Sequence, residues 1–368
     1  MTDLTKIDKP NTEITVAIGM SGGVDSSVAA YLLKKQGYNV IGLFMKNWEE
    51  EGEDGVCIAE EDFSDVSDVC EQLDIPYYSV NFSKKYWEQV FSPCLEEFDA
   101  GYTPNPDVLC NREIKFDALL NKAIELGADY LATGHYCQIQ EHNGRHCLVR
   151  GKDNGKDQSY FLYMIKDHIL EKVLFPIGGM EKPLVREIAK EIGLITATKK
   201  DSTGICFIGK RNFKSFLKNY IDHKPGNFET PEGRVVGTHD GLAFYTWGQR
   251  KGLGIGGPGE AWFVVGKNRE KNTVTVVQGE NHPLLLKSQI EGKELSWVGE
   301  EPQKLPYRCT AKLRYRQEDT HCTITKIEGD RIWVVFDQAQ RAVTPRQSIV
   351  FYQKEICLGG AIIDGDSL

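Results

Sequence analysis

The first part of the chain alternates short apolar runs with stretches that carry apolar residues at helical spacing. Buried strands are predicted at 14–18, 38–45, 76–82 and 129–136, and helices at 59–75, 84–102, 112–128, 166–173 and 182–193. Pro93 is expected to kink the helix at 84–102, and Gly127 to cap the helix at 112–128. Strands that alternate with helices indicate a parallel α/β sheet.

The pattern changes near residue 222, where strands and frequent glycines follow one another without a long helix. From residue 288 onward the β pattern continues through "CTAKLRYR", "HCTITKIEGDRIWVVFD" and "QSIVFYQKEICLGGAII", a tail typical of small barrels. We therefore expect an α/β domain with a parallel sheet over 1–220. A small β-rich domain over 221–287 and a barrel-like β domain over 288–368 should follow it.

Composition is that of an ordinary globular chain, with 368 residues, 40% hydrophobic and 26% charged. No apolar run approaches the ~20 residues that span a bilayer, and the N-terminal segment has no apolar core of a secretory signal. The sequence therefore predicts a cytoplasmic protein. The ten cysteines include no C-x-x-C pair, so we expect no metal site and mostly buried cysteines.

Charge gives a mixed indication about nucleic acid. The net charge of −9 argues mildly against RNA binding, because phosphate contacts favour a basic surface. Basic residues nevertheless gather at 199–218 and at 304–316, the second with interleaved tyrosines. Each stretch fits a solvated face as well as an RNA contact.

The stretch "AIGMSGGVDSSVAAYLL", residues 17–33, runs from a strand through a Gly/Ser turn into a helix. Such a turn binds anions through backbone N–H groups and the helix dipole. It has no lysine, unlike the phosphate-binding loop G-x-x-x-x-G-K-[ST]. Asp25 is suited to hold Mg²⁺ beside a phosphate, and Ser26 and Ser27 are possible helix caps. A plain, well-capped turn is the alternative.

Two cysteines lie in unusual surroundings. Cys110 follows Asp107 in "TPNPDVLCNREIKF", just before a predicted helix, whose N-terminus would lower the pKa of a thiol. Cys206 lies in "DSTGICFIGKR", where nearby basic residues favour the thiolate. Each cysteine alone is equally compatible with a buried structural role. Two reactive thiols together suit a sulfur transfer, in which one carries a persulfide and the other attacks it.

The Ser-Gly-Gly-x-Asp-Ser string after the first strand resembles the PP-loop of the N-type ATP pyrophosphatases, which adenylate an oxygen and release pyrophosphate. Over most of its length the chain also resembles the bacterial tRNA-uridine 2-sulfurtransferases. The motifs that carry this resemblance are "GMSGGVDSSVAA", "GLFMKNWEE", "TPNPDVLCNREIKF", "ATGHY", "KDQSYFLY", "KKDSTGICFIG", "GQRKGLGIGG" and "LRYRQ".

The resemblance implies roles for individual residues. Cys206 would carry the persulfide, Cys110 would complete sulfur transfer, and Asp107 would be the acid/base beside the target base. Implied ATP contacts are Gly19, Met20, Ser21, Gly22, Gly23, Val24, Asp25, Ser26, Met45 and Gly134. Implied tRNA contacts are Asn105, Pro106, Asp107, His135, Lys156, Asp157, Gln158, Arg314, Tyr315 and Gln347.

The implied reaction is ATP- and Mg²⁺-dependent 2-thiolation of the wobble uridine in tRNAs for Lys, Glu and Gln. The β-rich tail would grip the anticodon arm, and a persulfide-carrying relay protein or a cysteine desulfurase would supply sulfur. We expect a monomer without membrane contact. Two alternatives are a PP-loop amide synthetase, which needs no cysteine pair, and a nucleotide-gated RNA-binding module that does not release pyrophosphate.

Overall fold

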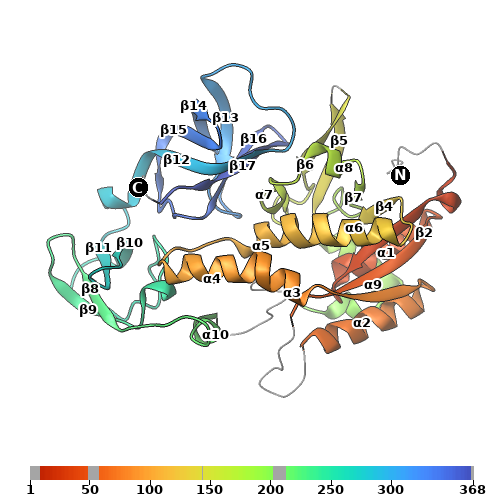
Figure 1. The fold of residues 1–368 in the computed structure, drawn as a ribbon, viewed down its shortest axis with the longest axis horizontal. Coiled ribbons are helices and arrows are strands. Elements are labelled where there is room, and N and C mark those ends of the chain that lie inside the picture. Colours follow the sequence, from red (N-terminus) through yellow and green to blue (C-terminus); the bar gives the residue numbers. More distant parts are fainter. Residues whose placement is uncertain (1–8, 49–57, 143, 202–212, 366–368) are drawn as a thin grey trace.

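The structure is a computed structural model that describes residues 9–48, 58–142, 144–201 and 213–365. Figure 1 shows an α/β body, a small sheet at one end of the molecule, and a barrel on the side of the body where the helices at 92–109 lie. No helix in these ranges has the length and apolar character needed to cross a membrane.

A five-stranded sheet forms the centre of the α/β body. Its order is β3-β2-β1-β4-β7, and every pairing is parallel, which confirms the predicted sheet type. The strands are β1 (Thr15–Met20), β2 (Asn39–Lys46), β3 (Tyr77–Asn81), β4 (Tyr130–Ala132) and β7 (Val173–Leu174).

Helices cover both faces of this sheet because alternate strand residues point to opposite sides. On β1, Val16 and Ile18 belong to a core that includes Val28 of α1 (Val24–Lys35) and Val185 of α9 (Lys182–Glu191). Ala17 between them belongs to a second core on the other face. The turn between β1 and α1 therefore stands on a strand that is packed from both sides.

Two long helical segments cross the second face. The first comprises α3 (Ser83–Tyr86), a π-helical turn (Trp87–Phe91) and α4 (Ser92–Asp99), with Pro93 in the first turn of α4. The second comprises α5 (Pro106–Leu109), a π-helix (Cys110–Leu119) and α6 (Leu120–Glu125). Gly127 has φ +85° just beyond α6 and accepts the left-handed conformation of a helix end, as predicted.

Two local predictions need correction. The segment predicted as a helix at 166–173 forms only one turn, α8 (Asp167–Leu170), before β7 begins. The sequence analysis also missed a hairpin of β5 (Cys137–His142) and β6 (Arg145–Arg150), whose Val149 pairs with Ile356 of the distant β17. The two strands pair locally, but β5 is largely exposed and its residues have no apolar run that would indicate a strand. The helix predicted at 59–75 is α2 (Ile58–Gln72).

The second half of the chain forms two β units, as expected. A four-stranded sheet has the order β10-β11-β8-β9. Six further strands close into an antiparallel barrel through a β12–β17 pairing. The small sheet contains β8 (Gly226–Glu229), β9 (Val235–His239), β10 (Trp262–Asn268) and β11 (Thr273–Gln278). The barrel contains β12 (Leu286–Trp297), β13 (Tyr307–Lys312), β14 (Thr320–Glu328), β15 (Arg331–Arg341), β16 (Ser348–Gln353) and β17 (Ile356–Ile363).

The barrel and the α/β body share one hydrophobic core. Val350 and Tyr352 of β16 pack in the same cluster as Leu148 and Tyr163 of the body. Apolar burial of this kind is the main source of cohesion between elements. The relative position of barrel and body is therefore set by packing.

Candidate functional site

Glycine backbone and serine hydroxyls shape the turn between β1 and α1. Gly22 has φ +68°, and a Cβ added there would lie 2.7 Å from the Asp62 carbonyl oxygen. The hydroxyls of Ser26 and Ser27 donate to the Gly23 carbonyl at 3.1 and 2.9 Å. Gly23 is the N-cap, so the expected capping by the two serines is wrong, and no side chain caps the helix. The first N–H groups of α1 are thus suited to an anion.

Gly134 packs directly against this turn. A Cβ at Gly134 would lie 2.8 Å from the backbone nitrogen of Ser26 and 2.9 Å from the carbonyl carbon of Asp25. Only glycine therefore lets the loop after β4 come this close. Met45 is buried on β2, next to the residue that pairs with Met20 of β1. The predicted nucleotide residues thus gather around one edge of the sheet, and their contact with ATP stays a prediction.

A lysine from a distant part of the chain lies at this turn. The Lys182 Nζ atom is 2.7 and 2.8 Å from the two carboxylate oxygens of Asp25. The Tyr136 hydroxyl donates to the same carboxylate at 2.8 Å, and the pKa of that hydroxyl is raised by burial and by Asp25. Lys182 is only 7% exposed. The sequence analysis missed it because 157 positions separate it from Asp25.

The same ammonium group reaches a second carboxylate. Lys182 Nζ lies 2.9 Å from Asp201, which is also paired with Lys156 at 2.6 Å and Arg186 at 2.7 Å. Burial raises the pKa of the Asp201 carboxyl, but the hydrogen bonds from Lys156 and Lys182 outweigh it and hold that pKa well below its ordinary value. Asp153 also lies here, because its carboxylate accepts from the Lys182 backbone N–H at 2.9 Å, so three cations face three carboxylates beside the turn. The ammonium group of Lys182 is thus placed at the turn, where it can interact with a phosphate.

Asp107 and Cys110 are close in sequence, but they occupy different positions in the second helical segment. Pro106 opens α5, so Asp107 lies in the first helical turn, where the dipole favours a carboxylate. Cys110 lies one turn later, at the start of the π-helix, and its side chain is buried. The predicted helix-start position for Cys110 is therefore wrong, because the helix begins earlier than the sequence pattern indicated. Cys206 lies outside the described residues.

A cavity of about 600 Å³ opens where the three parts of the molecule meet. The loop before α5 borders it with Asn105, and the barrel with Arg314, Tyr315 and Gln347, all implied as tRNA contacts. The other residues that line the cavity are not among the site residues predicted from sequence, although most of them lie within or beside the motifs "KDQSYFLY" and "GQRKGLGIGG" or in the barrel. These are Thr103, Pro104, Tyr160, Phe161, Thr246, Trp247, Gly248, Gln249 and Thr344.

Hydrogen bonds hold the walls of this cavity together. Gln347 Nε2 donates to the carbonyl oxygens of Thr103 and Pro104 at 2.6 and 3.2 Å. The hydroxyls of Thr103 and Thr246 lie 3.1 Å apart, which joins the loop to the middle β unit. The rings of Phe161 and Tyr315 lie 4.6 Å apart and form an aromatic wall. Aromatic walls of this kind stack unpaired RNA bases.

The other implied tRNA contacts have partners within the chain. His135 is buried, its Nδ1 is 2.7 Å from the Thr133 hydroxyl, and burial holds its pKa well below the ordinary value. Asp157 is buried and accepts from the backbone N–H groups of Gly151 and Ser159 at 3.1 Å. Gln158 Oε1 accepts from the Tyr136 backbone at 3.0 Å, and Lys156 pairs with Asp201. Their contact with RNA stays a prediction.

Within the described ranges no group of three or more His, Cys, Asp or Glu side chains is placed to hold a metal ion. Asp25, expected to hold Mg²⁺, is instead bound to Lys182 and Tyr136 in this structure.

The domain class follows from comparison with known families. Residues 14–210 match the family model described as "tRNA methyl transferase HUP domain". Residues 214–278 match "tRNA methyl transferase PRC-barrel domain", and residues 287–363 match "Aminomethyltransferase beta-barrel domain". The chain is thus a HUP-domain protein with two appended β units, in agreement with the observed order of sheets.

Curated relatives define the family more narrowly. A protein of Protochlamydia amoebophila is 60% identical over 350 residues, which cover 95% of this chain and 93% of the relative. One of Alkaliphilus oremlandii is 56% identical over 360 residues, or 97% of this chain and 99% of the relative. Both are named tRNA-specific 2-thiouridylase MnmA. The chain belongs to the family of tRNA-specific 2-thiouridylases.

Proposed function

We propose that this chain replaces the C2 oxygen of the wobble uridine in tRNAs for Lys, Glu and Gln by sulfur, with ATP as activating substrate. The family supports a tRNA thiolase. The observation that carries the proposal is that one chain combines two features. The first is a turn suited to an anion, with Lys182 beside it, and the second is a cavity between the three parts of the molecule with an aromatic wall.

In the first half-reaction the C2 oxygen attacks the α-phosphate of ATP, and pyrophosphate leaves. The target base is extruded from its stack to reach the cavity, because base edges are inaccessible inside a stacked loop. Backbone N–H groups of residues 21–27 stabilise the leaving pyrophosphate, and Lys182 moves from Asp25 to a phosphate oxygen. Asp25 would then hold the Mg²⁺ that enters with ATP and neutralises phosphate charge.

In the second half-reaction the terminal sulfur of a Cys206 persulfide attacks C2, and AMP leaves with the former oxygen. The Cys110 thiolate then attacks the Cys206 sulfur, the S–S bond breaks, and the sulfur bonded to C2 leaves with its electron pair. The products are 2-thiouridine and a Cys110–Cys206 disulfide, which a thiol reductant reopens. Asp107 would act as acid/base beside the target base.

Partners and state belong to the same proposal. A persulfide-carrying relay protein or a cysteine desulfurase would load Cys206, and the barrel would grip the anticodon arm by shape and phosphate contacts. The protein would work as a monomer, with the cavity lined by residues from its own three parts. We infer that the protein works in the cytoplasm.

Cysteine variants test this proposal. Cys110→Ser and Cys206→Ser should each abolish 2-thiouridine formation, while tRNA binding and tRNA-dependent pyrophosphate release persist, because adenylation precedes sulfur transfer. Cys147→Ser, at a half-buried position on β6, is the matched control and should keep full thiolation. Full thiolation by Cys110→Ser would refute the two-cysteine mechanism. Absence of pyrophosphate release would favour a binding module without turnover.

A further inference from the structure

A pair of cysteines faces one another inside the barrel, apart from the cysteines of the proposed reaction. Cys309 on β13 and Cys322 on β14 are opposite partners in the antiparallel register. Their Sγ atoms lie 3.6 Å apart, in van der Waals contact and without a bond. Opposite residues of an antiparallel pair have Cβ atoms at roughly the separation that a disulfide spans.

The surroundings leave room for a bond between these sulfurs. Both side chains belong to the barrel core, and Ala311, the next inward residue of β13, presents only a methyl group. Opposite residues of an antiparallel pair have Cα atoms about 4.5–5.5 Å apart, within the range of about 4.4–6.8 Å that disulfides span. The strand pairing therefore already brings Cys309 and Cys322 within range of a disulfide.

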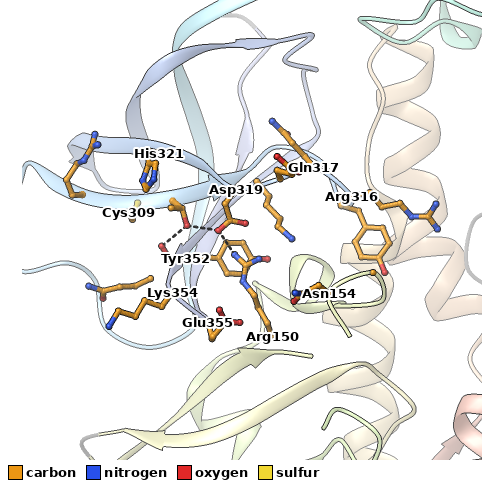
Figure 2. Close-up of a pocket in the computed structure, with 17 residues that line it drawn as sticks. Arg150, Asn154, Cys309, Arg316, Gln317, Asp319, His321, Tyr352, Lys354 and Glu355 are labelled. Carbon is orange, nitrogen blue, oxygen red and sulfur yellow. Dashed lines mark hydrogen bonds and ion pairs between the residues drawn. The ribbon is translucent and has the colours of Figure 1, made fainter. Parts of the chain in front are cut away.

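The two thiols differ in access. Cys309 is 8% exposed and borders a cavity of about 890 Å³ between the barrel and the β5–β6 hairpin, whereas Cys322 is fully buried. Figure 2 shows Cys309 among the lining side chains, near His321 on the neighbouring strand, with the ion pair of Arg150 and Asp319 at the centre of the cavity. Hydrogen bonding with Cys309 and burial raise the pKa of the Cys322 thiol far above its ordinary value. Cys309 is therefore the thiol that a small oxidant meets first.

We propose that Cys309 and Cys322 form an oxidation site that hydrogen peroxide converts into a reversible cross-strand disulfide. Peroxide oxidises the Cys309 sulfur to a sulfenic acid and is reduced to water. The Cys322 sulfur then attacks the Cys309 sulfur, the S–S bond forms, and the sulfenic oxygen leaves as a second water. Two thiols lose two protons and two electrons to one peroxide, and a dithiol reductant restores both thiols.

The disulfide would tie β13 to β14 immediately before the residues that line the proposed base cavity. Arg314 and Tyr315 lie two and three residues beyond the end of β13 and border that cavity. Oxidation at this pair would therefore act on the barrel wall. The proposal does not depend on the thiolation reaction.

Peptide mapping of the full-length protein tests this site. Reduced protein is treated with hydrogen peroxide, quenched, alkylated and digested with trypsin without reduction. Cleavage beside Arg308, Lys312, Arg316 and Lys326 separates residues 309–312 from residues 317–326, so a disulfide appears as one linked peptide. We expect that linked peptide, loss of both alkylated cysteines, and their recovery after dithiothreitol. Cys309→Ser and Cys322→Ser should each remove the linked peptide.

Cys147, half-buried on β6, reports in the same digest whether peroxide acted on the protein. If Cys147 is oxidised while Cys309 and Cys322 stay alkylatable, the proposal is wrong. It is also wrong if either cysteine proceeds to the sulfinic acid without any linked peptide, because a partner thiol at 3.6 Å should capture the sulfenic acid first.

Discussion

At the scale of single residues, the nucleotide loop depends on groups that lie far from it in sequence. Asp25 belongs to the loop, yet both of its carboxylate oxygens are bound by Lys182 of α9. Lys182 is buried whereas Asp25 is partly exposed, so loss of Asp25 would leave the buried ammonium group without this partner, which is costly. We therefore interpret Lys182 as a substitute for the lysine of the G-x-x-x-x-G-K-[ST] loop, which this loop lacks.

Substitution of Lys182 tests this interpretation. Lys182→Ala should lower tRNA-dependent pyrophosphate release by about 100-fold or more, the usual cost of losing one preorganised charged donor at developing phosphate charge. Lys34→Ala removes a half-exposed lysine that pairs with Asp74 and should have no effect. An unchanged rate in a folded Lys182→Ala protein would exclude a role for Lys182 in adenylation.

Gly134 provides a steric test of the same loop. Gly134→Ala would place a Cβ 2.8 Å from the Ser26 nitrogen and push the β4 loop away from the turn. We expect ATP binding, measured by calorimetry, to weaken about tenfold or more, since a tenfold change needs only about 1.4 kcal/mol. Gly299→Ala is the control, because a Cβ there meets nothing within 4 Å. Equal affinity of both variants would show that this packing is irrelevant to the nucleotide.

At the scale of elements, α4 and the loop after it are held by both β units. Arg346 of the barrel pairs with Glu97 of α4 at 2.8 Å. Arg269, just after β10 of the middle unit, pairs with Asp99 at 2.8 Å, and Lys267 donates to the Gly101 carbonyl at 2.5 Å. Residues 102–105 continue from this point into the cavity, so the two β units together position the loop that carries Asn105.

Gln347 is the barrel residue that contacts this loop, and its removal should show the effect. Gln347→Ala loses two hydrogen bonds to the Thr103 and Pro104 carbonyls, each worth about 1 kcal/mol. We expect a higher KM for tRNA in the thiolation assay with ATP affinity unchanged. Gln353→Ala, which removes an exposed hydrogen bond to the Tyr307 hydroxyl, should leave both values unchanged. A Gln347→Ala enzyme with normal KM would contradict the positioning role.

Lys267 gives this contact a pH dependence. Burial lowers the pKa of its ammonium group from 10.5 to about 7 in the folded protein. Between these values the unfolded chain binds one more proton than the folded chain, so the free energy of unfolding rises with pH across this window. Lys267→Met should remove that rise when urea unfolding is compared at about pH 7 and about pH 10. Lys271→Met, at an exposed position, should keep it. Identical pH dependence in all three proteins would contradict the expected burial of this charge.

Elements that are determined by residues close together in sequence could be predicted, whereas contacts between distant residues could not. The β-branched run of β1 and the helical spacing of residues 112–125 are local signals, and both elements were predicted. The β6–β17 pairing and the Asp25–Lys182 ion pair join residues more than a hundred positions apart, and neither leaves a local pattern. The start of α5 at Pro106 was missed because the proline-rich stretch looked like a loop.

At the scale of the whole molecule, one chain combines an anion-binding edge in its α/β body with a cavity that needs all three parts. The protein carries a net charge of −9, so the overall field does not favour RNA, and the proposed RNA contacts are local groups such as Arg314 and Lys156. In the proposed reaction the turn after β1 serves activation of the oxygen, and the cavity serves recognition of the RNA. Neither the turn nor the barrel alone would therefore indicate which reaction is catalysed.

The proposed product of this chain is 2-thiouridine. The most direct measurement is nucleoside analysis of unmodified tRNA for Lys, Glu or Gln after incubation with the protein, ATP, Mg²⁺ and a persulfide donor. We expect 2-thiouridine at the wobble position, formed in step with pyrophosphate and absent when ATP or the persulfide donor is omitted. Pyrophosphate release without any 2-thiouridine, or no reaction at all with a loaded donor, would contradict it.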